Sequence, residues 1–221
     1  MRKILLAAAA IVVLSFAVAL YAYQDPSIPD RVPAHWNAAG QVDGYLPKFW
    51  GLFFVPILGV LLLPLFIVLP RIDPLKKNIM EFRHYYDGFI AVFMGFLFYL
   101  QIITLLLITG SDFHIIQALA PAFGVLFYCI GILLGKSKRN WFIGIRTPWT
   151  LSSDKIWDRT HALGGRLFKI AGVLSLLGAF FYEHALWFIL APIIAFSAFL
   201  VVYSYFEYRK QGKRPKKKAH K

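Results

Sequence analysis

Residues 49–69 read FWGLFFVPILGVLLLPLFIVL, an apolar run without a single charged side chain. A helix needs about 20 such residues to cross a hydrocarbon core that is about 30 Å thick. Five further runs have the same character: residues 4–23, 88–108, 115–134, 167–182 and 186–205. Because backbone groups in lipid must find their hydrogen bonds within the segment, the runs predict an all-α, polytopic membrane bundle of six transmembrane helices. A mean hydropathy of +0.62, outside the range of ordinary soluble domains, agrees with this interpretation.

The distribution of basic residues predicts the orientation of the bundle. Of 24 Lys and Arg residues, only Arg31 and Lys48 fall on one side of the predicted membrane, and the remaining 22 fall on the other. Cytoplasmic segments carry the excess of Lys and Arg, so both termini are expected in the cytoplasm of a multi-pass cell-membrane protein. The net charge of +13 then reflects topology and interaction with membrane lipids, and not direct binding of nucleic acid.

The first apolar run also has features of a secretory signal, since Arg2 and Lys3 precede it and small residues follow. Its length exceeds the about 7–15 residues of a signal core, which favours a retained helix. A retained helix and a cleaved signal both place the following loop outside the cell. The chain is therefore divided into four parts: residues 1–69 with the external loop 24–48, residues 70–134, residues 135–206 with a long cytoplasmic loop and the third helix pair, and the basic tail 207–221.

Several function classes lack their sequence signals. The chain contains no GxSxG, HExxH, GxxxxGK[ST] or GxGxxG motif, and no Asp, Glu or Arg lies near the middle of a predicted span. Coupled transporters need ionisable groups at that depth. The buried amide of Gln101 is better explained by a hydrogen bond between helices, and the single Cys129 has no partner for a disulfide. We therefore expect a protein that acts by binding, with no catalytic residues, no bound metal and no cofactor.

The external loop contains PAHWNAAGQVDGY at residues 33–45. Prolines hold its start extended, and turns are predicted at residues 37–40 and 43–44. The candidate ligand-binding residues are His35, Trp36, Asn37, Asp43 and Tyr45. Trp36 and Tyr45 also suit an interfacial aromatic belt. A zinc site formed by His35, His114 and His184 with neighbouring acids is a further alternative, although no helical spacing fixes such ligands.

The cytoplasmic loop contains NWFIGIRTPW at residues 140–149, followed by a helix that Thr150, Ser152 or Ser153 can cap. The aromatic and Arg side chains are typical of binding surfaces. The candidate partner-binding residues are Asn140, Trp141, Arg146, Thr147, Pro148, Trp149, Trp157 and His161. A purely structural plug that covers the helix ends is the alternative interpretation.

These two segments together resemble the SdpI family of membrane proteins. PDRVPAHWNAAGQVDGY is similar to the external domain of that family, and NWFIGIRTPWTLSSDKIWDRTHALGGRLF is similar to its cytoplasmic loop and following helix. The resemblance implies immunity against a secreted toxin peptide, and in some members signal transduction by holding a transcriptional repressor at the membrane. A membrane enzyme that uses external His35 and Asp43, with or without a metal, and a small permease remain alternatives. The positions that match the family pattern are Pro33, His35, Trp36, Asn37, Gly40, Asp43 and Gly44 outside, and Asn140, Trp141, Gly144, Arg146, Thr147, Pro148, Trp149, Trp157, His161 and Gly165 inside.

Overall fold

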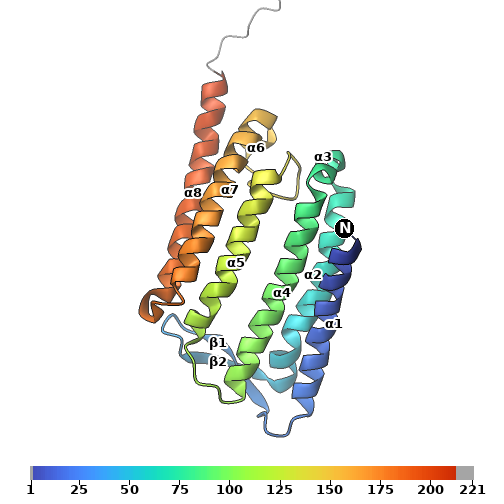
Figure 1. Cartoon of the computed structure of the whole chain (residues 1–221), viewed down its shortest axis with the longest axis vertical. Helices are drawn as coiled ribbons and strands as arrows, with labels where there is room; N and C mark the ends of the chain where they lie inside the picture. Colours follow the sequence, from blue (N-terminus) through green and yellow to red (C-terminus); the bar gives the residue numbers. More distant parts are fainter. Residues whose placement is uncertain (1, 213–221) are drawn as a thin grey trace, which may run out of the picture.

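A computed structural model describes residues 2–212 as a helical bundle with a small β-hairpin at one end (Figure 1). Residues 213–221, most of the predicted basic tail, lie outside the described residues. The long helices are α1 Arg2–Gln24, α2 Lys48–Ile72, α4 Arg83–Ile108, α5 Ile115–Lys136, α7 Asp154–Leu177 and α8 Ala185–Gly212. The short elements are β1 Arg31–Trp36, β2 Val42–Pro47, α3 Lys76–Glu81, α6 Pro148–Leu151 and the 3₁₀ turn η1 Tyr182–His184. The all-α membrane bundle is confirmed.

Helix α7 differs from the prediction. The sequence predicts a capped cytoplasmic helix followed by a separate span at residues 167–182, whereas one helix runs from Asp154 to Leu177 and the chain then turns through η1. Within residues 2–212, five helices are long and apolar enough to cross a membrane, and α7 is not among them. The first half of α7 carries charged residues on the face opposite its buried Trp157 and His161, which lowers its overall hydropathy. A sixth crossing therefore stays a prediction.

The long helices form two groups of three. Helices α1, α2 and α4 pack on one another, as do α5, α7 and α8, and the contact between α4 and α5 joins the groups (Figure 1). Within the first group, Gln101 of α4 donates its amide to the Ser15 carbonyl of α1 at 2.9 Å, and the Ser15 hydroxyl donates back to Gln101. This confirms the predicted hydrogen bond between helices. One cluster of buried apolar side chains lies mainly in the first group and another mainly in the second, and Leu133 of α5 and Ile103 of α4 each belong to the cluster of the opposite group.

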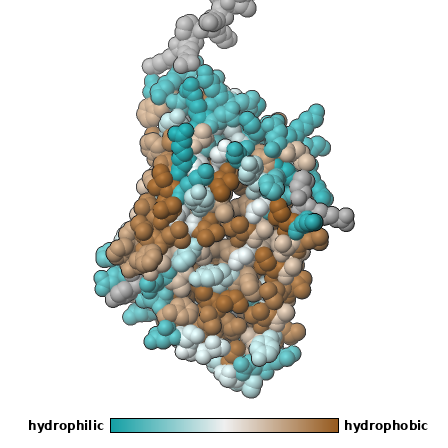
Figure 2. Space-filling model, in the orientation of Figure 1, coloured by the Kyte–Doolittle hydropathy of each residue, from teal (hydrophilic) through white to brown (hydrophobic). Residues whose placement is uncertain are grey.

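The surface is divided in the way that a bilayer requires. Figure 2 shows an apolar band across the middle of the bundle and polar residues gathered at both ends. We call the end that carries β1 and β2 the hairpin end, and the end that carries residues 137–153 the loop end. Helix α1 begins and α8 ends toward the loop end (Figure 1). The exposed apolar side chains along the helices are thus positioned to face lipid.

The hairpin arises from pairing that the sequence did not predict. Strands β1 and β2 are antiparallel, and His35 pairs with Gly44. The turn predicted at residues 37–40 is confirmed: Asn37 accepts the Ala39 and Gln41 N–H groups with its side-chain oxygen, and Gly40 has a φ of 77°. The turn predicted at residues 43–44 is wrong, because both residues lie within β2. A Cβ on Gly44 would lie 2.9 Å from the His35 Cβ, so the glycine is needed for close strand pairing.

Candidate functional site

The hairpin presents a histidine–aspartate pair. His35 Nδ1 lies 2.5 Å from Asp43 Oδ1, and the two side chains are 72% and 44% exposed. The strand pairing that sets His35 opposite Gly44 brings the neighbouring Asp43 within reach. At this exposure the pair contributes little to stability, since water screens the charges. Its main effect is to orient the imidazole, with Nε2 left as the second polar atom of the ring.

A cavity of about 540 Å³ lies beside this pair, between the hairpin and the helices of the second group. The hairpin contributes His35, Trp36 and Asn37, and the opposite walls are apolar residues of α5 and α8. Trp36 is partly buried against the apolar cluster of the second group, so it is both a wall of the cavity and part of the packing. An apolar pocket with a few convergent polar groups is typical of a ligand site.

The cavity therefore brings together three of the five candidate ligand-binding residues. Asp43 supports the site through His35. Tyr45 is 52% exposed and does not line the cavity, so it lies apart from the other candidate residues. The sequence also did not indicate the apolar walls from α5 and α8, because they come from segments distant in the chain.

The hairpin is held rigidly on the bundle. Val32 is fully buried and packs so closely on α2 that Gly51 has no room for a Cβ. At the turn, a Cβ on Gly40 would lie 2.8 Å from the His114 ring. The Lys48 ammonium donates to the Asp25 carbonyl at 2.7 Å, and hydrogen bonds from Ser27 lower the pKa of Asp25. The cavity wall is therefore preformed.

The described residues offer limited support for a metal site here. Within residues 2–212, no three His, Cys, Asp or Glu side chains lie close enough together to hold a metal ion. Structural zinc sites use four protein ligands and catalytic sites use three. The His35 and Asp43 pair alone is better suited to hydrogen bonding.

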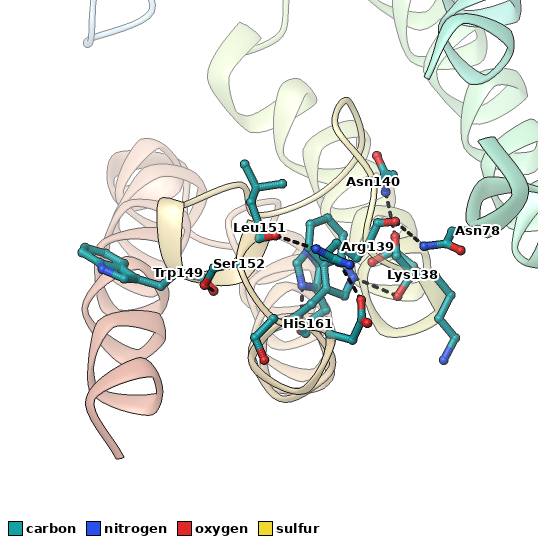
Figure 3. A network of polar contacts seen from close by, with 12 residues as sticks. Asn78, Lys138, Arg139, Asn140, Trp149, Leu151, Ser152 and His161 are labelled. Carbon is teal, nitrogen blue, oxygen red and sulfur yellow. Dashed lines mark hydrogen bonds and ion pairs between the residues drawn. The ribbon is translucent and has the colours of Figure 1, made fainter. Parts of the chain in front are cut away.

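At the loop end, Asn140 organises the predicted partner-binding segment (Figure 3). This side chain is fully buried; its amide donates to the Lys138 and Ile143 carbonyls, and its oxygen accepts the Phe142 and Ile143 N–H groups. All four side-chain hydrogen bonds are thus made to the local backbone. Asn140 shapes the loop and is not accessible to a partner.

The same loop joins the two helix groups. Asp73, at the end of α2, accepts the Trp141 N–H at 2.8 Å, and Asn78 of α3 donates to the Arg139 carbonyl at 2.8 Å (Figure 3). Arg139 in turn donates to Asp154 at 2.6 Å and to the Leu151 carbonyl at 2.8 Å. The sequence alone does not indicate Asp73, Asn78 and Arg139, because their roles come from contacts between distant segments.

His161 forms the floor of the loop. Its ring stacks on Trp157 at a centroid distance of 3.9 Å; Nδ1 donates to the Trp157 carbonyl, and Nε2 accepts the Ile145 N–H at 2.9 Å. Burial lowers the pKa of His161 to about 4, against a smaller opposing effect of the bond to Trp157. Gly144, with a φ of 121°, leaves no room for a Cβ beside Nε2. The imidazole is therefore neutral at neutral pH, with a fixed tautomer.

Thr147 and Thr150 close the segment by capping α6 reciprocally, each side chain bonding the backbone of the other. Thr147 also bonds Ser204 of α8 at 3.1 Å, and the Trp149 ring lies 5.1 Å from that of Tyr205. These contacts fasten α6 to α8.

The candidate partner-binding residues thus fall into two sets. Asn140, Thr147, Trp157 and His161 are buried and serve the fold. The accessible residues are Trp141, Arg146, Pro148 and, in part, Trp149. Arg146 donates to the Trp141 backbone carbonyl at 2.7 Å, which ties its exposed guanidinium to the loop backbone. Only this second set is positioned to contact another molecule.

Comparisons with known proteins match both candidate surfaces. Residues 136–204 match the SdpI/YfhL protein family, and residues 10–60 match a domain of unknown function, DUF1648. The chain is 23% identical over 201 residues to Immunity protein SdpI of Bacillus subtilis strain 168, covering 90% of this chain and 93% of that protein. No solved structure matches the chain. The resemblance identified from the two motifs is confirmed, and the matched segments contain the hairpin and the loop.

Proposed function

We propose that this member of the SdpI/YfhL family is an immunity protein that binds a peptide toxin at the hairpin end, on the outer face of the cell membrane. Similarity to Immunity protein SdpI along nearly the whole chain supports this function. The single observation that carries the site is the cavity of about 540 Å³ between the hairpin and helices α5 and α8.

The chemistry of the cavity suits a hydrophobic peptide. Its apolar walls can take up aliphatic or aromatic side chains, whereas the imidazole of His35 can bond a peptide backbone. Because the hairpin is fixed by Val32 and Gly51, little conformational entropy is lost on binding. No reaction is needed: the toxin is held away from its target by binding alone.

The test is a survival assay in a Bacillus subtilis strain that lacks its SdpI and is challenged with the toxin that SdpI counteracts. The wild-type chain should protect, and His35→Ala and Trp36→Ala should reduce protection at equal membrane abundance. Arg31→Gln, an exposed change on the hairpin outside the cavity lining, is the matched control. Equal protection by all variants would exclude this cavity as the toxin site.

We also propose a second role, in signalling, for the loop end. The exposed side chains of Trp141 and Arg146 lie on a loop that is bonded to both helix groups, so a change in the packing of the groups alters their position. We propose that they bind a cytoplasmic transcriptional repressor when toxin is bound outside. Arg146→Ala should abolish repressor capture in pull-downs from membranes while toxin protection persists; joint loss of both would assign the loop to the fold alone.

A further inference from the structure

A second cavity, of about 350 Å³, lies in the seam between the two helix groups near the loop end. Its walls come from α2, α4, α5, α7 and the loop at 142–145; they include Phe66, Tyr86, Leu133, Phe142, Ile145 and Phe168. It is separate from the hairpin cavity, which shares no lining residue with it.

The interior of the seam cavity is suited to hydrocarbon. Its walls are aliphatic and aromatic side chains, and the phenol of Tyr86 already donates to the Phe66 carbonyl at 2.9 Å. A polar ligand buried there would lose its hydrogen bonds to water without replacement. In a bundle immersed in lipid, an acyl chain is the apolar group that is available in excess.

Two cations are held at the polar side of this seam. The Lys136 ammonium of α5 lies 5.7 Å from the ring centroid of Tyr85 on α4, so it bridges the seam itself. Arg146 directly follows the wall residue Ile145, and its guanidinium is bonded to the Trp141 carbonyl. Both cations are exposed, and the neighbouring Trp141 and Phe142 are exposed aromatics of the kind found at headgroup level.

Two acids at this end of the bundle are already engaged. Asp73 accepts the N–H groups of Leu75 and Trp141, and Asp87 is paired with Arg83 at 2.6 Å. Lys136 and Arg146 therefore present their positive charge to solvent or to a ligand. Arg and Lys both bind phosphate oxygens, and Arg does so with two parallel hydrogen bonds.

We propose that the seam cavity binds one acyl chain of an anionic phospholipid, whose phosphate contacts Lys136 and Arg146. The bound acyl chain fills the space between the two helix groups. It supplies van der Waals contacts there, where the side chains of the two groups do not reach each other. The site lies apart from the hairpin cavity proposed for the toxin, and it shares Arg146 with the surface proposed for the repressor.

This proposal can be tested by native mass spectrometry of the purified full-length protein. The protein is titrated with phosphatidylglycerol or with phosphatidylcholine that carries the same acyl chains. The wild type should retain one phosphatidylglycerol with about tenfold or greater preference, as expected for two cations near a headgroup. The Lys136→Gln and Arg146→Gln double variant should lose the preference. A control that removes two exposed lysines at the same end, Lys76→Gln with Lys155→Gln, should keep it.

Filling the cavity should remove binding of both lipids. Leu133→Trp is the first variant for this purpose, and Ile130→Phe replaces it if Leu133→Trp does not elute as a monodisperse protein. Glycerol 1-phosphate, which carries the headgroup phosphate without a chain, should not compete. Equal retention of the two lipids by the wild type, undiminished binding to a folded cavity-filled variant, or competition by glycerol phosphate would each overturn the proposal.

Discussion

Gly131 of α5 and Gly165 of α7 face each other with no room for a side chain on either. A Cβ on Gly131 would lie 2.8 Å from the Gly165 carbonyl oxygen, and a Cβ on Gly165 would lie 2.8 Å from the Gly131 carbonyl oxygen. Two helical turns away, Gly124 and Gly172 repeat this relationship at 3.0 and 2.6 Å. Small residues at such positions let two membrane helices approach to backbone contact. The second helix group is therefore assembled on this crossing.

Adding a methyl group at the crossing should separate the helices. Gly131→Ala and Gly165→Ala are each expected to destabilise the protein by about 1–3 kcal/mol, the usual cost of overpacking. Gly88→Ala and Gly95→Ala in α4, where a Cβ would meet no atom within 4 Å, should be neutral or stabilising. Unfolding in detergent followed by circular dichroism measures the difference. Equal effects at all four sites would show that the crossing of α5 and α7 has room for a methyl group.

The loop end should depend on Asn140. Asn140→Ala leaves the Lys138 and Ile143 carbonyls and two N–H groups without their partner, at a cost on the order of 3 kcal/mol for several buried polar groups. Trp141→Ala is the control, since its ring is 50% exposed, and it should cost less than about 1 kcal/mol. Proteolysis of the loop in membrane vesicles should be accelerated by the first change only. Similar cleavage of both variants would mean that other contacts order the loop.

His161 should make the stability pH-dependent. Burial lowers its pKa to about 4, below the unfolded value of about 6.5, so the folded state favours the neutral ring. The contribution of the neutral, buried imidazole to the free energy of unfolding is complete above pH 6.5. It is lost as the pH falls from 6.5 toward 4. Between pH 7 and pH 5 the wild type should lose about 2 kcal/mol more stability than His161→Gln, which does not titrate. Parallel pH profiles of the two proteins, measured by thermal unfolding in detergent, would contradict this.

Much of the fold is predictable from hydropathy because a bilayer imposes length and polarity on each crossing segment. The run at residues 49–69 lies within α2, and the run at 88–108 lies within α4. Helix α7 is different: its inner face is buried by protein, so its sequence pattern is amphipathic and hydropathy alone misplaces its ends. The hairpin was missed because its strands are short, and their pairing depends on the anchor of Val32 on α2.

The candidate sites were predictable in part. The clustering of His35, Trp36 and Asp43 within one short loop correctly indicated neighbours in space, since a hairpin brings such residues together. In the segment at the loop end, the same types of residue divide between the interior and the surface. Asn140 is buried and Arg146 is exposed, and this difference is decided by partners such as Asp73 and Asn78 that are far away in the sequence.

The packing of the hairpin on α2 can be tested with a pair of substitutions, in which the second should restore part of the stability lost through the first. Gly51→Ala brings a methyl group against Val32, which is fully buried, and should both destabilise the protein and displace the cavity wall. Val32→Ala removes the methyl groups involved and should recover part of the loss in the double variant, although alone it costs about 1–3 kcal/mol. A double-mutant cycle on thermal stability measures the coupling. Additive effects would show that the two residues do not pack together.

The last prediction is that α7 crosses the membrane. The 22-to-2 distribution of Lys and Arg predicts that the loop end lies in the cytoplasm and the hairpin end outside. If α7 also crosses, the turn at η1 returns to the hairpin side. Cys129 is the single native cysteine, so a Cys129→Ala background accepts one new cysteine at a time: Ala39→Cys in the hairpin turn, Ser152→Cys after α6, or Glu183→Cys in η1.

A membrane-impermeant maleimide added to intact cells should label the cysteines at positions 39 and 183, and the cysteine at position 152 only after permeabilisation. The charged first half of α7 makes this outcome informative, because an amphipathic helix can also lie along the interface. In that case positions 152 and 183 would label from the same side, and α8 would run in the direction opposite to that required for a cytoplasmic C-terminus. Opposite labelling of these two positions is therefore the result that separates a six-span bundle from a five-span one.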